Sequence, residues 1–209
     1  MRDVNKDNIT EVFMNYFGPD TDPRVKEILQ SLVTHLHAFA KDVNLTHAEW
    51  QVGIEFLERA GQISDKERHE FVLLSDVLGL SSLVDMLHSS PGGTSSSVLG
   101  PFHISGAPAI PIGADLRGKF TEQVVLAEGV VKDTDGNPIE SAEVDIWQTA
   151  PNGLYSSQDP DQDTYSFHGI QTTGKDGRYA FTTVKPVSYT VPSDGPVGDI
   201  LRASGRHPW

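Results

Sequence analysis

Residues 124–148, VVLAEGVVKDTDGNPIESAEVDIWQ, decide the fold of this chain, because apolar and polar residues alternate along them. This period of two predicts β-strands, and the Asp-Gly-Asn-Pro segment between them has the composition of a turn. Residues 172–184, TTGKDGRYAFTTV, repeat the pattern around Asp176 and Gly177. Short strands without helices between them are typical of an antiparallel β-sandwich. We therefore expect strands over most of residues 124–185.

The residues before this region have the period of an α-helix. Asp22 and Pro23 match a helix N-cap followed by proline in the first turn, and apolar residues then recur at helical spacing up to Phe39. We expect helices over most of residues 9–88. Two further helix starts are predicted by capping boxes, Thr46 with Glu49 and Ser64 with Glu67, opening runs that end near residues 61 and 87.

A Gly- and Ser-rich segment separates the two patterns. Residues 89–97, SSPGGTSSS, cannot continue a helix and are typical of a linker. The sequence thus predicts an all-α N-terminal helical domain over residues 1–90, followed by a mainly antiparallel β-sandwich domain over residues 91–209. The apolar stripe of residues 25–39 is wide, which suits either a core or the helix of a partner subunit.

Composition excludes several classes of function. The 209 residues carry a formal net charge of -13, which disfavours nucleic acid and anionic membranes as partners. Cysteine is absent, so disulfides, zinc–thiolate sites and cysteine nucleophiles are excluded. The N-terminus lacks the apolar core of a signal peptide, and Asp76 and Asp85 interrupt the most apolar stretch. We expect a soluble, cytoplasmic protein without membrane insertion.

The histidines do not form a recognisable metal motif. His35 and His37 resemble a His-x-His pair, but they lie in a helical run, where residues i and i+2 point to different sides. The interpretation as solvated or interface residues is favoured for them. His103 and His168 are expected in loops, where they could line a cleft. The remaining histidines near helix ends are expected at the surface: His47, His69 and His88.

Two tyrosines lie beside turns in the C-terminal part. Tyr155 follows a Pro-Asn-Gly turn, and Tyr189 follows the strand pattern around residue 180. A phenol is normally neutral, with a pKa near 10. A trivalent cation reverses this preference and holds the phenolate, which is a hard oxygen donor suited to ferric iron. The spacing alone leaves both interpretations open, structural tyrosines and metal ligands.

Longer motifs around these tyrosines resemble one enzyme family. They are VDIWQTAPNGLYSSQDPDQ (144–162), GRYAFTTVKPVSYTVPSDGPVG (177–198), VLGPFH (98–103) and RHPW (206–209). Together they resemble the intradiol ring-cleavage dioxygenases, in the branch of the hydroxyquinol and catechol 1,2-dioxygenases. The resemblance covers nearly the whole chain, including the order of helices and sandwich.

The resemblance implies a chemistry. In this family Fe(3+) is held by two tyrosinates and two histidines; Tyr155 aligns with the ligand that stays bound and Tyr189 with the catalytic axial ligand that leaves when substrate binds. A catechol-type diol, hydroxyquinol or catechol, chelates the iron and is cleaved by O2 to a muconate-type diacid. The ion acts as Lewis acid and template.

The resemblance also implies a substrate pocket and a partner. A homodimer through the N-terminal helices, with space for a lipid, is expected. The substrate-binding residues fall at a helix end, on the wall formed by the VLGP segment and after the axial tyrosine: Leu83, Asp85, Val98, Leu99, Gly100, Pro101, Val191 and Pro192.

The C-terminal segment departs from the family pattern. In the family, RHPW leads into an Arg-Pro-Ala-His-x-His run that supplies both histidine ligands and an arginine. Here the sequence stops at Trp209, and neither Arg206 nor His207 belongs to that run. We therefore expect a C-terminally truncated chain with an incomplete sandwich and negligible activity of its own.

A different class of protein shares part of the pattern. Residues 128–147 and 172–181 also resemble transthyretin-like and carboxypeptidase-regulatory-like sandwich modules, which bind without a metal. Such a module needs neither the helical N-terminal part nor Tyr155 nor the segment 189–198. Visible colour separates the two readings, since ferric tyrosinate absorbs visible light and a metal-free module does not.

Overall fold

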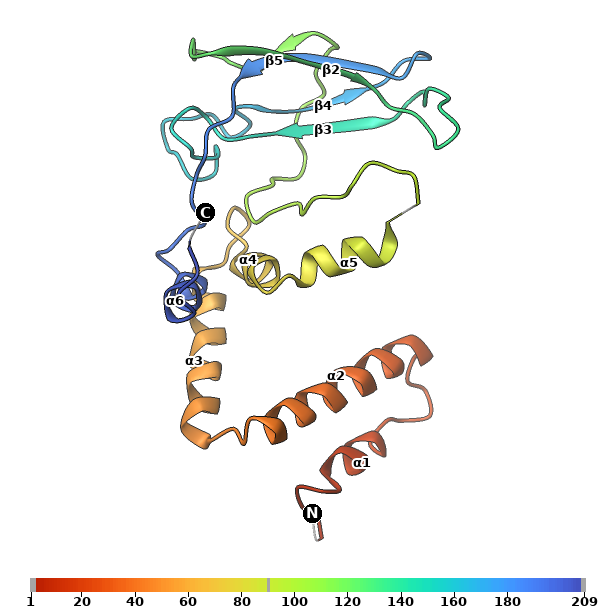
Figure 1. Ribbon diagram of the computed structural model, residues 1–209, viewed down its shortest axis with the longest axis vertical. Coiled ribbons are helices and arrows are strands. Elements are labelled where there is room, and N and C mark those ends of the chain that lie inside the picture. The colour runs from red at the N-terminus through yellow and green to blue at the C-terminus, as the bar shows by residue number, and fades with distance from the viewer. Residues whose placement is uncertain (1–2, 90, 208–209) are drawn as a thin grey trace. The chain divides into compact units, whose positions relative to one another are not determined.

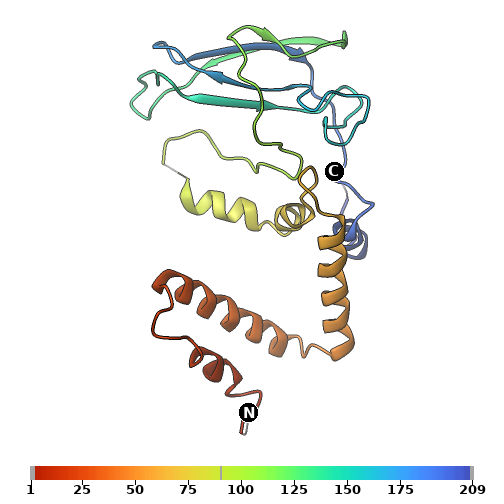
Figure 2. The same ribbon diagram turned by 180° about the vertical axis from the view of Figure 1, so that it is seen from behind.

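The structure is a computed structural model that describes residues 3–89 and 91–207 (Figures 1 and 2). The chain falls into two compact units, residues 1–56 and residues 57–209, and each is described by itself. The helices of residues 70–88 thus belong with the strands in one unit. The functional boundary expected near residue 90 stays a prediction.

The first unit contains helices whose predicted starts are confirmed. The Asp22 carboxylate accepts hydrogen bonds from the N–H groups of Arg24 and Val25, at 2.9 and 3.0 Å. The Glu49 carboxylate accepts from the N–H of Thr46 at 2.8 Å, as a capping box requires. The helices are α1 (Ile9–Met14), α2 (Pro23–Asp42) and the first part of α3 (His47–Ile63).

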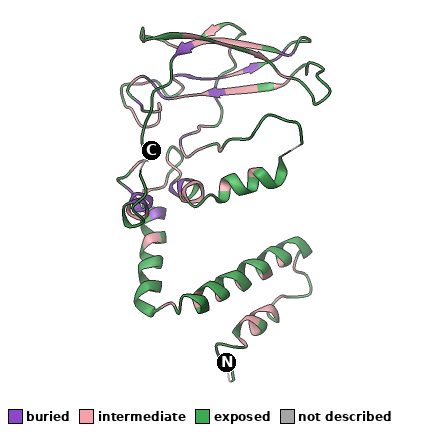
Figure 3. Cartoon of the chain, viewed as in Figure 1, coloured by how far each residue is buried: buried purple, intermediate pink, exposed green. Residues whose placement is uncertain are grey.

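The apolar stripe of α2 is not covered within this unit. Neither α1 nor α2 contains a buried residue, as the green and pink ribbon of Figure 3 shows. Phe39 remains 54% exposed and Leu36 52%. His35 and His37 do not converge, since His35 Nδ1 lies 2.8 Å from the Ser31 carbonyl oxygen and His37 Nδ1 lies 2.9 Å from Thr10 Oγ1.

The described residues of the second unit contain three further helices, and one predicted helix start is wrong. Ser64 and Glu67 form no capping box. Instead, Asp65 accepts hydrogen bonds from the N–H groups of Glu67 and Arg68, both at 2.8 Å, which makes a turn before the helix. The predicted single run then divides into two helices, which meet at an angle of 74°. The helices are α4 (Glu70–Val77), α5 (Leu80–His88) and α6 (Pro196–Ala203).

Five strands of this unit form two sheets that lie one above the other (Figure 1). One sheet has the order β1-β5-β2 and the other pairs β3 with β4. Strands joined by the two Asp-Gly turns therefore belong to different sheets, so the chain crosses between layers after each turn. Around the first turn, Lys132 and Pro138 form a short antiparallel bridge. The strands are β1 (Ala114–Asp115), β2 (Val124–Val130), β3 (Glu143–Trp147), β4 (His168–Thr172) and β5 (Arg178–Val184).

The core between the sheets is small and lies at one end of the strands. Ala150, Phe167 and Val184 are each 1% exposed and pack together. The Phe120 ring packs against Phe167 with centroids 5.2 Å apart. Because Ala150 closely follows β3, this core fixes the start of the loop that carries Tyr155.

Helices α4 and α5 lie on the outer side of the β3–β4 sheet, and α6 packs against α4 (Figures 1 and 2). Among the described residues, no helix by itself has the length and hydropathy to cross a membrane; α4 and α5 would pass only as a bent pair. Helix α6 was not expected from the sequence. Its signals are Pro196 in the first turn and Asp199 near the N-terminus.

Candidate functional site

Tyr155 and Tyr189 meet, as the sequence predicts. Their hydroxyl oxygens are 2.7 Å apart, so one hydroxyl donates a hydrogen bond to the other. The two rings cross at 89°, with centroids 5.6 Å apart. Tyr155 also stacks on the buried Phe102 ring at 5.6 Å, whereas Tyr189 is 45% exposed. One phenol is therefore fixed by packing and the other is held on an open loop.

A tight turn after β3 presents Tyr155. The N–H of Gly153 donates to the Ala150 carbonyl, and the N–H of Ala150 donates to the Leu154 carbonyl, both at 2.9 Å. Gly153 has φ +81°, a left-handed conformation that favours glycine. The N–H of Tyr155 then donates to the Gln158 side chain at 3.1 Å. The Pro-Asn-Gly sequence thus has a structural purpose, which is to turn Tyr155 toward the loop of Tyr189.

The environment of Tyr155 keeps its phenol protonated without a cation. Burial raises the pKa of Tyr155 above its ordinary value, and the hydrogen bond with Tyr189 acts in the same direction. A high pKa is what desolvation produces when no opposite charge is near. A cation of high charge between the two oxygens would reverse this effect by stabilising phenolate.

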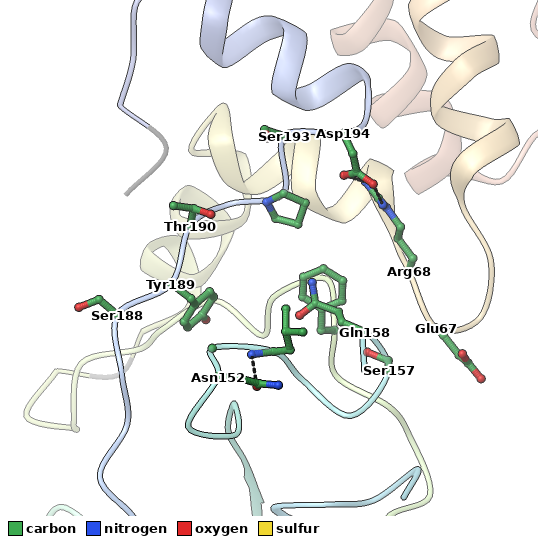
Figure 4. Close-up of a pocket in the computed structure, with 14 residues that line it drawn as sticks. Glu67, Arg68, Asn152, Ser157, Gln158, Ser188, Tyr189, Thr190, Ser193 and Asp194 are labelled. Atoms are coloured by element: carbon green, nitrogen blue, oxygen red, sulfur yellow. Dashed lines mark hydrogen bonds and ion pairs between the residues drawn. The ribbon is translucent and has the colours of Figure 1, made fainter. Parts of the chain in front are cut away.

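An ionic network with the buried Glu70 at its inner end holds the segment that carries Tyr189. Arg68 donates to both oxygens of Asp194, at 2.7 and 2.9 Å, and Figure 4 shows the two side chains reaching toward one another. Glu70, which is 1% exposed, accepts from Arg68 at 3.1 Å and from the N–H of Val197 at 3.1 Å. A side chain at Gly195 would overlap the Glu70 carboxylate. The network fastens α4 to the N-terminus of α6, where a carboxylate is stabilised.

Two adjoining cavities open at the tyrosine pair. One, of about 660 Å³, is lined by Tyr189, Arg68 and Asp194 with the loop of residues 152–158 (Figure 4). The other, of about 510 Å³, is large enough for a small aromatic ligand. Most of the pocket residues expected from the sequence line this second cavity: Tyr155, Tyr189, Val98, Leu99, Gly100, Pro101, Val191 and Pro192.

Two expected pocket residues are elsewhere, and others take their place. Leu83 and Asp85 lie on α5 and do not line the cavity. Asp76 of α4 does, and its Oδ1 is buried without a hydrogen-bond partner among the described residues. The other residues that line this cavity were not predicted from the sequence, and three of them come from α4: Leu73, Asp76, Val77, Ser97, Phe102, Trp147 and Arg206.

The expectation that His168 lies in a loop is wrong. It is the first residue of β4 and is buried, while His103 follows the cavity wall. Both imidazoles form hydrogen bonds with the carboxylate of Asp145, and each Nε2 lies 2.9 Å from a different carboxylate oxygen. The hydrogen bonds of this cluster run within it, and the bond between the two tyrosine hydroxyls includes none of its three residues.

The oxygen donors of the tyrosine pair are of a kind that suits a ferric ion. Phenolate oxygens are hard ligands that suit a trivalent cation, and both hydroxyls already face the same point. Two donors do not complete a coordination shell. The tyrosine pair therefore accounts for half of the ligand set that the family resemblance implies.

Comparison with known protein families agrees with this geometry. The profile described as "Catechol dioxygenase N terminus" matches residues 22–92, and the profile described as "Dioxygenase" matches residues 105–209. The chain belongs to the intradiol catechol and hydroxyquinol 1,2-dioxygenase family. Membership accounts for the helical part as well as the sandwich, which the alternative of a metal-free sandwich module does not.

Several members of the intradiol family are similar over most of this chain. The 6-chlorohydroxyquinol 1,2-dioxygenase of Cupriavidus pinatubonensis is 42% identical, over 100% of this chain and 76% of that protein. The hydroxyquinol 1,2-dioxygenase of Nocardioides simplex is 40% identical, over 98% of this chain and 70% of that protein. The chain thus spans about three quarters or less of their lengths.

Solved structures of the family share the fold. The hydroxyquinol 1,2-dioxygenase of Pseudomonas putida has a TM-score of 0.82 and 43% identity, covering 98% of this chain and 72% of that one. The catechol 1,2-dioxygenase of Acinetobacter radioresistens has a TM-score of 0.80 and 27% identity, covering 100% of this chain and 70% of that one. The predicted order of helices and sandwich is therefore confirmed.

Proposed function

We propose that the protein opens the ring of an aromatic 1,2-diol with O2, giving a muconate-type diacid that contains both oxygen atoms of O2. One observation supports this proposal more strongly than the others. The hydroxyls of Tyr155 and Tyr189 lie 2.7 Å apart, and both tyrosines line a cavity of about 510 Å³. Fe(3+) held by their oxygens would supply Lewis acidity and a template for the diol.

The two tyrosines have different roles in this proposal. Tyr155 stacks on Phe102 and is bonded through its N–H to Gln158, so it holds its position throughout. Tyr189 is 45% exposed on a loop, so its side chain can turn away as a diol arrives. If a bound ferric ion held Tyr189 as phenolate, the released oxygen would take a proton from one diol hydroxyl and become a neutral phenol. Asp194 and Arg68 keep the backbone of the loop in place while the ring moves.

Asp76 favours a diol with a further hydroxyl group. Its Oδ1 is buried, lines the cavity and has no partner among the described residues. A buried carboxylate oxygen without a partner is costly, and a ligand hydroxyl that donates to it removes this cost. Hydroxyquinol carries such a hydroxyl and catechol does not. We therefore take hydroxyquinol as the preferred substrate and catechol as the poorer one.

The preference is testable through two matched aspartates. The assay measures O2 uptake and diacid formation by a chain extended beyond residue 209 with the family's His-x-His strand. Asp76→Asn is expected to lower the ratio of kcat/KM for hydroxyquinol over catechol by about tenfold, the value of a hydrogen bond to a charged group. Asp85→Asn, on α5 away from the cavity, is expected to leave the ratio unchanged.

If Asp85→Asn lowered the ratio of kcat/KM values and Asp76→Asn left it unchanged, Asp85 would be the aspartate that faces the ring. Absence of any diacid from the extended chain would contradict the proposed reaction itself. Residues 1–209 alone are expected to give negligible turnover, because they contain two tyrosine oxygens but not the histidine run that the resemblance implies.

The family resemblance also supports a homodimer as part of the proposal. One face of α2 carries a row of large apolar residues. Each of them is between 36% and 54% exposed to solvent: Val25, Ile28, Leu29, Leu32, Leu36 and Phe39. Such a row exceeds the scattered apolar residues of an ordinary surface. We propose that a second copy of the chain covers this face, with a lipid as an additional occupant.

A further inference from the structure

We propose that His103, Asp145 and His168 form a second metal site, for a divalent ion of the zinc class, separate from the tyrosine pair. Their donor atoms all lie within 4.8 Å of one another. His103 Nε2 is 2.9 Å from Asp145 Oδ2, and His168 Nε2 is 2.9 Å from Asp145 Oδ1. Two imidazole nitrogens and a carboxylate oxygen are a ligand set that zinc accepts, with water in the fourth position.

The fold brings these donors together from three separate segments. Trp147 of β3 lies opposite His168 of β4 in the antiparallel register. Asp145 is two residues before Trp147, so it is the diagonal neighbour of His168 on the same face of the sheet. His103 arrives from the segment after α5, and its ring packs edge-on against Trp147 with centroids 4.7 Å apart. Strand register and aromatic packing therefore fix all three ligands.

Burial suits a metal ion. The His168 side chain is 4% exposed, that of His103 is 13%, and that of Asp145 is 33%. Partial exposure of Asp145 leaves a path by which an ion and its water reach the cluster.

Hydrogen bonds without a metal ion could also explain the two distances of 2.9 Å between the imidazole nitrogens and the Asp145 oxygens. Each imidazole can donate its Nε2–H to one oxygen of the Asp145 carboxylate. A zinc ion bonded to nitrogen at about 2.0–2.1 Å would replace those two protons and push the donor atoms apart by a few tenths of an ångström. The two accounts differ in whether the cluster takes up an ion, which is directly measurable.

A metal here would affect the cavity of the proposed reaction. His103 directly follows Phe102, whose ring stacks on Tyr155 and lines both cavities. An ion bonded to His103, Asp145 and His168 would fasten this wall to strands β3 and β4. The ion is therefore expected to stabilise the fold and to order the wall, without contacting the diol.

The test uses untagged, chelator-treated protein in which Tyr155→Phe and Tyr189→Phe remove the tyrosine site. Titration with Zn²⁺ by calorimetry, and with Co²⁺ by visible absorption, is expected to show one tight equivalent. His103→Gln and Asp145→Asn are each expected to weaken binding at least about tenfold, since each removes a donor or its charge. His47→Gln, on the exposed face of α3, is the matched control and is expected to change nothing.

X-ray absorption of the Zn²⁺-loaded chain gives a readout that needs no ligand variant. Two imidazoles in the first coordination shell are expected. Zinc at one hundred times its Kd is also expected to lower the unfolding equilibrium constant by about one hundredfold. The proposal is overturned if no tight equivalent binds, if the shell contains fewer than two imidazoles, or if His103→Gln and Asp145→Asn bind zinc as tightly as the parent protein. Because the tyrosines are absent from this background, the result is independent of the ring-cleavage proposal.

Discussion

Gly153 lies between the segments of the two tyrosines, and its missing side chain lets them approach. A Cβ at this position would lie 3.3 Å from the Cβ of Tyr189. Gly153→Ala is therefore expected to displace Tyr189, and its left-handed φ adds a strain of about 1–2 kcal/mol to the free energy of folding. We expect a weaker visible band in the iron-loaded extended chain and a lower urea midpoint.

Gly136 provides the matched control for this change. Its φ is +88°, but a Cβ there would meet no atom within 4 Å. Gly136→Ala should therefore cost similar stability while leaving the visible band unchanged. If Gly153→Ala and Gly136→Ala had visible bands of equal intensity, the close contact between Gly153 and Tyr189 would not determine the position of the tyrosine pair.

At the level of single residues, sequence motifs located the tyrosines but not the whole pocket. The contact between Tyr155 and Tyr189 follows from motifs whose turns have strict local geometry. Asp76 and Asp85 interrupt the same apolar stretch, and sequence alone does not decide which of them faces the cavity. The bend between α4 and α5 determines which aspartate faces the cavity, and that bend depends on tertiary packing. His168 was missed as a strand residue because its apolar run is short.

The link between α4 and α6 gives a prediction at the level of elements. Hydrogen bonds from Arg68 lower the pKa of Asp194 below the ordinary value of 3.8. A lowered folded-state pKa contributes stability above the unfolded value, and this contribution disappears as the pH falls through the folded value. The wild type should thus exceed Asp194→Asn in free energy of unfolding at pH 7, and the difference should shrink as the pH falls below 3.8 and through the lowered folded-state pKa.

Urea unfolding at a series of pH values measures this difference. The Asp194 side chain is 66% exposed, so the difference should also shrink in about 1 M salt. A difference that stays constant between pH 7 and pH 2 would mean that Arg68 does not act through the Asp194 charge.

Element types were more predictable than their pairing. Helical and two-residue periods are local properties of the sequence, and they predict α2, α3, β2 and β5 correctly. The pairing of β2 with β5 and of β3 with β4 is set by the packing of two layers, which the turn sequences do not reveal. Helix α6 depends on the buried Glu70 carboxylate at its N-terminus, a contact distant in sequence.

For the whole molecule, the exposed α2 face predicts association of two copies. Leu36, 52% exposed, belongs to this face. Leu36→Glu is expected to shift the mass of the extended chain, measured by light scattering at micromolar concentration, from dimer to monomer. Thr34→Glu places the same charge on the opposite side of the helix, since two residues advance it by about 200°. It should leave the mass unchanged, and a parent protein that is monomeric would contradict the prediction.

The visible spectrum of the iron-loaded, extended chain tests whether Tyr155 and Tyr189 hold ferric iron. Ferric iron bonded to phenolate absorbs visible light, whereas tyrosine without the ion does not. We expect a coloured protein with one bound iron, and loss of the band and most of the iron in Tyr155→Phe, because phenylalanine has no oxygen to donate. Tyr16→Phe, which changes an exposed tyrosine outside the site, should keep both. A Tyr155→Phe protein with undiminished colour and iron would show that Tyr155 does not bind the ion.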